Sequence, residues 1–84
     1  MNNKVYILTE YNYNSECGEE AGSWILGVFT SEKKAKEEMK KVIKNDIENE
    51  GYIYDNEMEN IVFFGKQENW NNYIEYGITE KEVE

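Results

Sequence analysis

The side chains in this sequence that could perform chemistry are one cysteine and many carboxylates, because histidine and arginine are both absent. Cys17 is surrounded by Glu16, Glu19 and Glu20, and neighbouring carboxylates disfavour the thiolate that a nucleophilic cysteine requires. Without histidine, the chain lacks the usual near-neutral acid–base group and the commonest metal ligand. No spacing selects one carboxylate pair among sixteen glutamates and two aspartates. We therefore predict a protein that is not an enzyme, with no catalytic residues and no cofactor.

One acidic segment, residues 46–57, has the spacing of an EF-hand calcium loop. Its oxygen-bearing residues and its turn glycine stand at loop positions 1, 3, 5, 6 and 12, as Asp46, Glu48, Glu50, Gly51 and Glu57. Two positions carry glutamate where aspartate or asparagine is usual, and the β-like segment Ile61–Phe64 follows where a helix is needed. The sequence has no second loop to pair with this one. We expect no bound metal and keep a calcium-binding module as an alternative.

The formal net charge is −9, and it is unevenly distributed. Residues 33–44 carry six lysines and two glutamates, whereas residues 45–84 carry two lysines and eleven acids. An acidic body repels nucleic acids and anionic membranes and is attracted to basic protein surfaces. Without arginine nearby, the lysine-rich segment is expected to be a solvated helix face with internal pairs such as Glu37 with Lys41.

Aromatic side chains are interleaved with acids late in the chain, and seven tyrosines and two tryptophans exceed what a small core hides. Tyr52, Tyr54 and Tyr76 belong to this run, and Tyr54 is a candidate apolar anchor. Tyrosine and tryptophan are enriched at protein interfaces, and acids beside them suit a basic groove. The predicted partner-binding residues are Asp55, Glu57, Glu59, Glu68, Trp70, Tyr73 and Glu75.

Two strands are expected before the middle of the chain. Residues 4–11 have apolar residues at the start of both faces, which predicts a central strand. Residues 12–22 contain Asn, Ser, Gly and Glu without periodicity and are expected to form a long loop. Residues 23–29 form the second predicted strand, in which Gly27 indicates a bulge or close packing.

A helix is predicted over residues 31–49, capped by Thr30 or Ser31 and ended at the latest by Gly51. The spacing of five apolar residues places them on one stripe of this helix: Ala35, Met39, Val42, Ile43 and Ile47. The lysines lie mostly on the opposite face.

The rest of the chain is β-like. Residues 52–54 form a short apolar patch, residues 61–65 a strand, and residues 73–83 a half-buried strand with Ile74, Tyr76 and Ile78 on one face. With 84 residues, the chain is expected to form one domain over 1–84. The predicted fold is a two-layer α+β domain of order β-β-α-β-β, with an antiparallel sheet and one helix on one face.

Nothing in the sequence predicts a membrane or secreted protein. No apolar run approaches the length of a membrane helix, and the N-terminus lacks the pattern of a signal peptide. A single cysteine excludes an internal disulfide and fits a reducing compartment. We therefore expect a cytoplasmic protein.

The first half of the chain resembles a group of small uncharacterised α+β proteins of low-GC bacteria and their phages. The resemblance rests on Lys4–Thr9 and on Ile25–Ser31 running into Lys33–Ala35, which match a strand, a glycine-apolar-phenylalanine-serine strand end and a Lys/Glu/Ala helix. Abundant Asn, Lys, Ile and Tyr, whose codons are AT-rich, point to the same origin. The resemblance implies the fold and no chemistry. In size and acidity alone, the chain is similar to anti-CRISPR and other anti-defence proteins.

These observations predict an acidic binding protein that inhibits a nucleic-acid-directed defence complex of a bacterial host. Nucleases and CRISPR effectors line their channels with basic residues, and an acidic protein is steered to the same surface. The expected partner is thus a protein with a basic surface, such as a CRISPR effector or a nuclease, with no direct binding to nucleic acid. The alternative is a small housekeeping or regulatory interaction domain whose acidity serves solubility.

Overall fold

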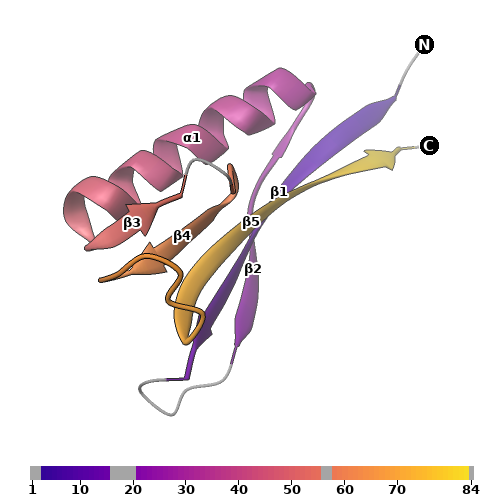
Figure 1. Ribbon diagram of the computed structural model, residues 1–84. Coiled ribbons are helices and arrows are strands. Elements are labelled where there is room, and N and C mark those ends of the chain that lie inside the picture. The colour runs from indigo at the N-terminus through magenta and orange to yellow at the C-terminus, as the bar shows by residue number, and fades with distance from the viewer. Residues whose placement is uncertain (1–2, 16–20, 56–57, 84) are drawn as a thin grey trace.

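The computed structural model describes residues 3–15, 21–55 and 58–83, which form six elements. In chain order they are β1 (Lys4–Asn14), β2 (Gly22–Phe29), α1 (Glu32–Asn49), β3 (Tyr52–Tyr54), β4 (Ile61–Phe64) and β5 (Asn72–Glu82). The strands form one antiparallel sheet of order β2-β1-β5-β4-β3, and α1 lies on one face of it (Figure 1). This confirms the predicted α+β fold, to which the short apolar patch adds a fifth strand, β3.

The β1–β2 hairpin is longer than the sequence predicted. Residues 12–14 continue β1 instead of starting a loop, because each of them pairs with β5, and Asn12 also pairs with Gly22 of β2. The ladder between β1 and β2 contains the irregularity that Gly27 indicated: Leu8 pairs with Gly27, and Thr9 pairs with Ile25. One residue, Leu26, is therefore extra in β2, as in a β-bulge.

β1 lies inside the sheet, as predicted, between β2 and β5. Its ladder with β5 is the longest of the fold and runs from the pair Lys4–Glu82 to the pair Asn14–Asn72. Because side chains alternate between the two faces of a strand, this register fixes which residues of β1 and β5 share a face.

Both ends of α1 have the predicted signals. The Ser31 hydroxyl accepts a hydrogen bond from the Lys34 N–H at 3.2 Å, and Glu32 lies in the first turn, where a carboxylate favours the helix dipole. After the last turn, Gly51 has a φ of +79°, a left-handed conformation that glycine adopts without strain. The chain can therefore leave the helix and enter β3 at once.

Replacing Ser31 by alanine is expected to lower the free energy of unfolding by about 1 kcal/mol, because an N–H of the first turn loses its acceptor. Urea unfolding monitored by circular dichroism measures this change. Thr30→Ala removes a hydroxyl from the neighbouring exposed residue and is the matched control. Equal losses in the two variants would contradict the assignment of Ser31 as the cap.

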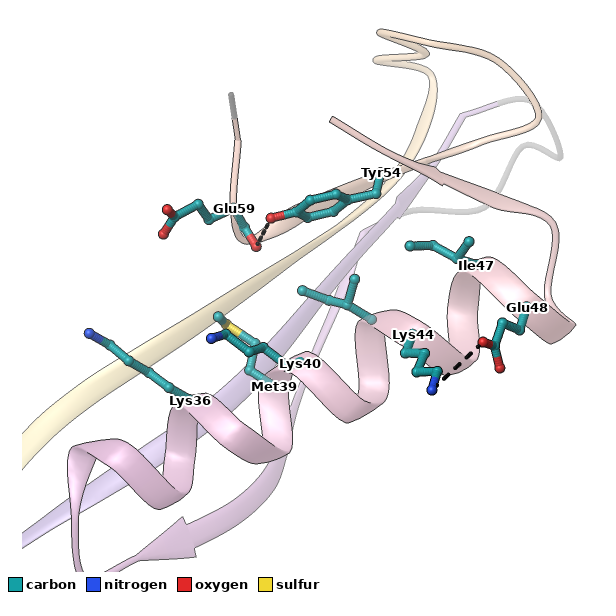
Figure 2. Close-up of a pocket in the computed structure, with 9 residues that line it drawn as sticks. Lys36, Met39, Lys40, Lys44, Ile47, Glu48, Tyr54 and Glu59 are labelled. Carbon is teal, nitrogen blue, oxygen red and sulfur yellow. Dashed lines mark hydrogen bonds and ion pairs between the residues drawn. The ribbon is translucent and has the colours of Figure 1, made fainter. Parts of the chain in front are cut away.

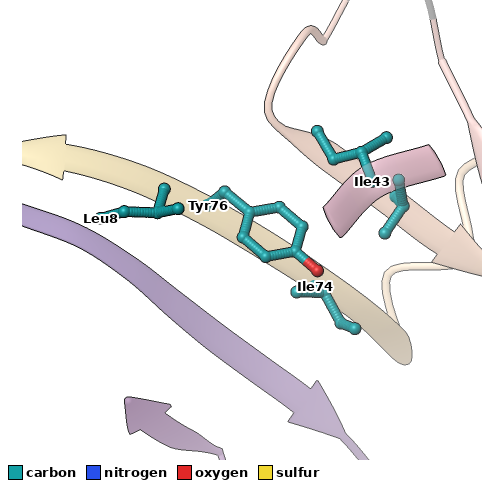
Figure 3. Close-up of a cluster of buried hydrophobic side chains, with 5 residues drawn as sticks. Leu8, Ile43, Ile74 and Tyr76 are labelled. Atoms are coloured by element: carbon teal, nitrogen blue, oxygen red, sulfur yellow. The ribbon is translucent and has the colours of Figure 1, made fainter. Parts of the chain in front are cut away.

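The core lies between α1 and the helix-facing side of the sheet, as Figure 3 shows for Leu8, Ile43, Ile74 and Tyr76. Ala35 and Ile43 of the predicted stripe are buried, and Met39 and Val42 pack against the core. Ile47 is the exception, because its side chain is 40% exposed. The predicted alternation of β5 is confirmed for its apolar face, but Tyr76 is fully buried and is not available to a partner.

Candidate protein-binding surface

The face of the sheet opposite α1 carries a group of aromatic side chains. We call Tyr11, Tyr13, Phe63, Trp70 and Tyr73 the aromatic patch. Alternation from the buried Leu8 places Tyr11 and Tyr13 of β1 on this face, and the register brings Tyr13 opposite Tyr73 of β5. Within the described residues, no helix or strand covers this face (Figure 1).

Trp70 is the most exposed member of the aromatic patch, with 46% of its surface accessible. It stands edge-on to the fully buried Phe63, with 4.8 Å between ring centroids, and edge-on to Tyr73 at 5.4 Å. Tyr73 continues the contact to Tyr13 at 5.5 Å. A large aromatic that is half exposed but supported from below is typical of a protein-binding anchor.

The loop between β4 and β5 holds Trp70 in place through its asparagines. Asn69 is buried, and its Nδ2 donates to the Phe64 carbonyl at 2.8 Å while its Oδ1 accepts from the Asn71 N–H at 3.3 Å. The Ser15 N–H donates to the Asn71 carbonyl at 2.8 Å, which joins this loop to the end of β1. The surface is therefore pre-organised, so little entropy is lost when a partner binds.

Two of the predicted acids border the aromatic patch. Glu75 is exposed on the same face, paired with Tyr11 of β1 and Ile61 of β4. Glu68 is exposed in the loop that carries Trp70, at a left-handed φ of +53°. Burial raises the pKa of Tyr73 above its ordinary value, with smaller contributions from Tyr11 and Glu75, so its hydroxyl stays protonated and can donate.

The structure divides the predicted site residues between different surfaces. Trp70, Tyr73 and Glu75 come together at the aromatic patch, and Glu68 lies in its loop. The other acids do not join them. Asp55 follows β3, and Glu59 lies in the turn before β4 at the border of a groove on the helix side of the sheet. Glu57 and Cys17 lie outside the described residues.

Tyr11 and Tyr13 belong to this surface but were not predicted for it. The sequence signal was present, because tyrosine alternates with asparagine over residues 11–14, the period-2 pattern of a strand. The asparagines suggested a loop, and the pairing with β5 outweighs that preference.

The groove on the helix side has a volume of about 640 Å³. Figure 2 shows Lys36, Lys40 and Lys44 along α1, with Tyr54 and Glu59 across from them. Its lysines are partly neutralised, since Lys36 pairs with Glu32 at 2.8 Å and Lys44 with Glu48 at 3.9 Å. These i,i+4 pairs fit the expectation of a solvated helix face.

A pair of carboxylates that the sequence did not single out meets at one phenol. The Tyr76 hydroxyl donates to Asp46 Oδ2, and Glu10 Oε1 lies 3.4 Å from the same hydroxyl. Burial raises the pKa of Asp46, and burial together with the Asp46 charge raises the pKa of Glu10. A protonated Glu10 can donate to the phenol oxygen, which gives each group a partner.

The calcium loop that the sequence left as an alternative is not formed over its described residues. Asp46 and Glu48 lie inside α1, and Glu50 caps its C-terminus. The Asp46 carboxylate turns toward Tyr76 in the core, away from any loop. Among the described residues, 3–15, 21–55 and 58–83, no three His, Cys, Asp or Glu side chains lie close enough together to hold a metal ion. In the described part of the chain, no helix is both long enough and apolar enough to cross a membrane.

The comparisons with known proteins bear on the family and not on the activity. No curated protein and no solved structure matches the chain. Residues 3–84 match the family model described as "Domain of unknown function (DUF7336)". Because this match spans nearly the whole sequence, the chain belongs to the DUF7336 family.

Proposed function

We propose that this protein is a non-enzymatic binding domain that contacts a protein partner through the aromatic patch. One observation carries the proposal: Trp70, nearly half exposed, stands edge-on to the buried Phe63 in the aromatic patch, on the side of the sheet that α1 does not cover. Aromatic anchors that become buried when the partner binds dominate the energetics of protein interfaces.

Charge indicates the chemistry of the partner. Glu68 and Glu75 border the aromatic patch, and the chain has a net charge of −9. Long-range attraction therefore steers the protein toward basic surfaces and accelerates encounter. Asp55 and Glu59 contribute to this field but make no direct contact in our proposal. Asp55 follows β3, and Glu59 borders the helix-side groove.

The more specific form of the proposal is a phage- or mobile-element-encoded inhibitor that acts in the bacterial cytoplasm. Its partner is a nucleic-acid-directed defence complex, such as a CRISPR effector or nuclease, whose channel is basic because it holds phosphates. The aromatic patch would occupy part of that channel, and the acidic border would replace phosphate contacts. Inhibition by occupation needs no catalysis, in keeping with a sequence that contains neither histidine nor arginine.

The double variant Glu68→Lys/Glu75→Lys is expected to lose its partner, because both substitutions place positive charge beside a basic surface. Pull-down from cells that carry defence systems, at low and high salt, measures this. Wild type should recover a nucleic-acid-handling protein at low salt and release it at high salt, since screening weakens charged contacts.

Glu37→Lys/Glu82→Lys is the matched control, because it makes the same charge change at exposed residues away from the aromatic patch. If both double variants lose the partner equally, overall charge and not this surface determines binding. Recovery of a partner with no role on nucleic acid would leave a binding domain but overturn the inhibitor proposal.

A further inference from the structure

β2 is an edge strand with an unpaired side. Only β1 lies next to it, so alternate N–H and C=O groups of β2 point away from the sheet without a strand partner among the described residues. Its eight residues span roughly 26 Å of extended backbone. The opposite edge, β3, has only three residues, so β2 is the longer free edge.

The side chains of β2 do not protect this edge. The segment Gly22–Phe29 contains no charged residue and no proline, although 32% of the chain is charged. Four of its five large apolar residues are exposed: Trp24 by 53%, Ile25 by 68%, Leu26 by 40% and Val28 by 58%, whereas Phe29 packs against the core. Natural edge strands usually carry charges or proline that prevent pairing with another chain. An edge without them is suited to pairing.

We propose that β2 pairs antiparallel with β2 of a second copy of this chain, across a two-fold axis, so that the two sheets become continuous. The fitting partner for this edge is an uncharged, apolar strand with its own free side, and β2 is such a strand. A two-fold axis between Leu26 and Gly27 places Ile25 of each copy opposite Val28 of the other, on the same face of the joined sheet. No charge is buried in this contact.

The bulge at Leu26 limits where the pairing runs. Bulges bend a strand and interrupt a regular ladder, so the new hydrogen bonds form on either side of Leu26. Ile25 and Val28 lie on the face opposite α1, because they pair with Thr9 and Ile7 of β1. In the dimer, Ile25 of each copy meets Val28 of the other, and the two side chains cover apolar surface that the monomer exposes.

This inference is independent of the proposed function and has the opposite response to salt. Two copies with a net charge of −9 repel each other, and the contact itself contains no ion pair. Screening shortens the Debye length from about 10 Å at 0.1 M to about 3 Å at 1 M. The β2 dimer should therefore strengthen as salt rises, whereas binding to a basic partner weakens.

Sedimentation velocity of the full chain over a wide concentration range, at low and high salt, tests the proposal. Wild type is expected to be a dimer that dissociates on dilution, and Ile25→Lys should weaken it by about tenfold or more, because it places a charge in an apolar contact. Ile25 is the most exposed large apolar residue of β2, so folding should be retained, which circular dichroism verifies. Val28→Lys is the second variant if Ile25→Lys does not fold.

Val83→Lys is the matched control, because it replaces another exposed apolar residue, 47% accessible, outside β2. It should leave the dimer intact. A monomer at every concentration and salt would overturn the proposal. It would be overturned even if β2 then proved to bind a strand of another protein. A dimer weakened equally by Ile25→Lys and Val83→Lys would also overturn it.

Discussion

Phe63→Ala is expected to lower the free energy of unfolding by about 3–5 kcal/mol, the usual cost of removing a buried aromatic ring. The Phe63 side chain is fully buried, although it lies on the sheet face that α1 does not cover. Its ring is enclosed by Trp70 at 4.8 Å and Tyr73 at 6.4 Å between centroids. Urea unfolding monitored by tryptophan fluorescence measures the change.

Phe64→Ala is the control, because it removes the same ring from the next residue of β4. Phe64 contacts Tyr52 edge-on at 5.3 Å but remains 41% exposed, so its loss should be smaller. Losses of the same size would show that Phe63 does not support Trp70 as described. Loss of stability in Phe63→Ala would also loosen the aromatic patch, so partner binding should fall with it.

The free energy of unfolding is expected to rise as the pH falls from neutral toward the ordinary carboxyl range. The pKa values of Asp46 and Glu10 are raised in the folded protein, chiefly by burial. A carboxyl with a raised folded pKa binds its proton more tightly when folded. Its contribution is fully present below the unfolded pKa and is lost as the pH rises through the folded pKa. Denaturant unfolding over this pH range measures the trend.

Asp46→Asn should flatten this pH dependence, because it removes one of the two buried titrations while keeping an oxygen for the Tyr76 hydroxyl. Relief of the overall negative charge acts in the same direction, so Glu37→Gln, which removes one exposed charge, is the control. The charged groups around Asp46 are Glu10 of β1 and Glu50 of the helix end, and the phenols of Tyr52 and Tyr76 face it from β3 and β5. Equal flattening by both variants would contradict this explanation.

Tyr76→Phe tests the same cluster from the other side. It leaves the Asp46 carboxylate buried without its donor, which should cost about 1–3 kcal/mol at neutral pH. Tyr54→Phe removes a hydroxyl that donates to the Glu59 carbonyl at an exposed position, so it should cost less. A smaller loss in Tyr76→Phe than in Tyr54→Phe would show that the phenol does not stabilise the buried acids.

Local patterns predicted the helix well because its signals are local. The stripe from Ala35 to Ile43 has the helical period, and the cap at Ser31 depends on residues three positions apart. The predicted end of β1, at residue 11, was wrong. Asn12 and Asn14 favour turns in isolation, but their pairing with β5 decides the structure. Tyr76 was expected among exposed aromatics by composition, but its alternation with Ile74 placed it in the core.

The candidate site was only partly predictable, since it depends on strand order. Trp70, Tyr73 and Glu75 are close in sequence and were found together. Tyr11 and Tyr13 join them only through a ladder between β1 and β5 that connects residues about sixty positions apart. The exposed apolar edge of β2 has the same origin, because no local pattern tells which strand lies at the border of a sheet.

The antiparallel pairing of β1 and β5 has a mechanical consequence. The Val83 N–H donates to the Asn3 carbonyl at 2.7 Å, so both ends of the described chain lie side by side at one end of the molecule (Figure 1). A force that pulls these ends apart loads the eleven rungs of the ladder one after another, from Lys4–Glu82 inward. The domain should therefore unzip at low force instead of resisting in shear. The same closeness allows it to be inserted into a surface loop of another protein without stretching either chain.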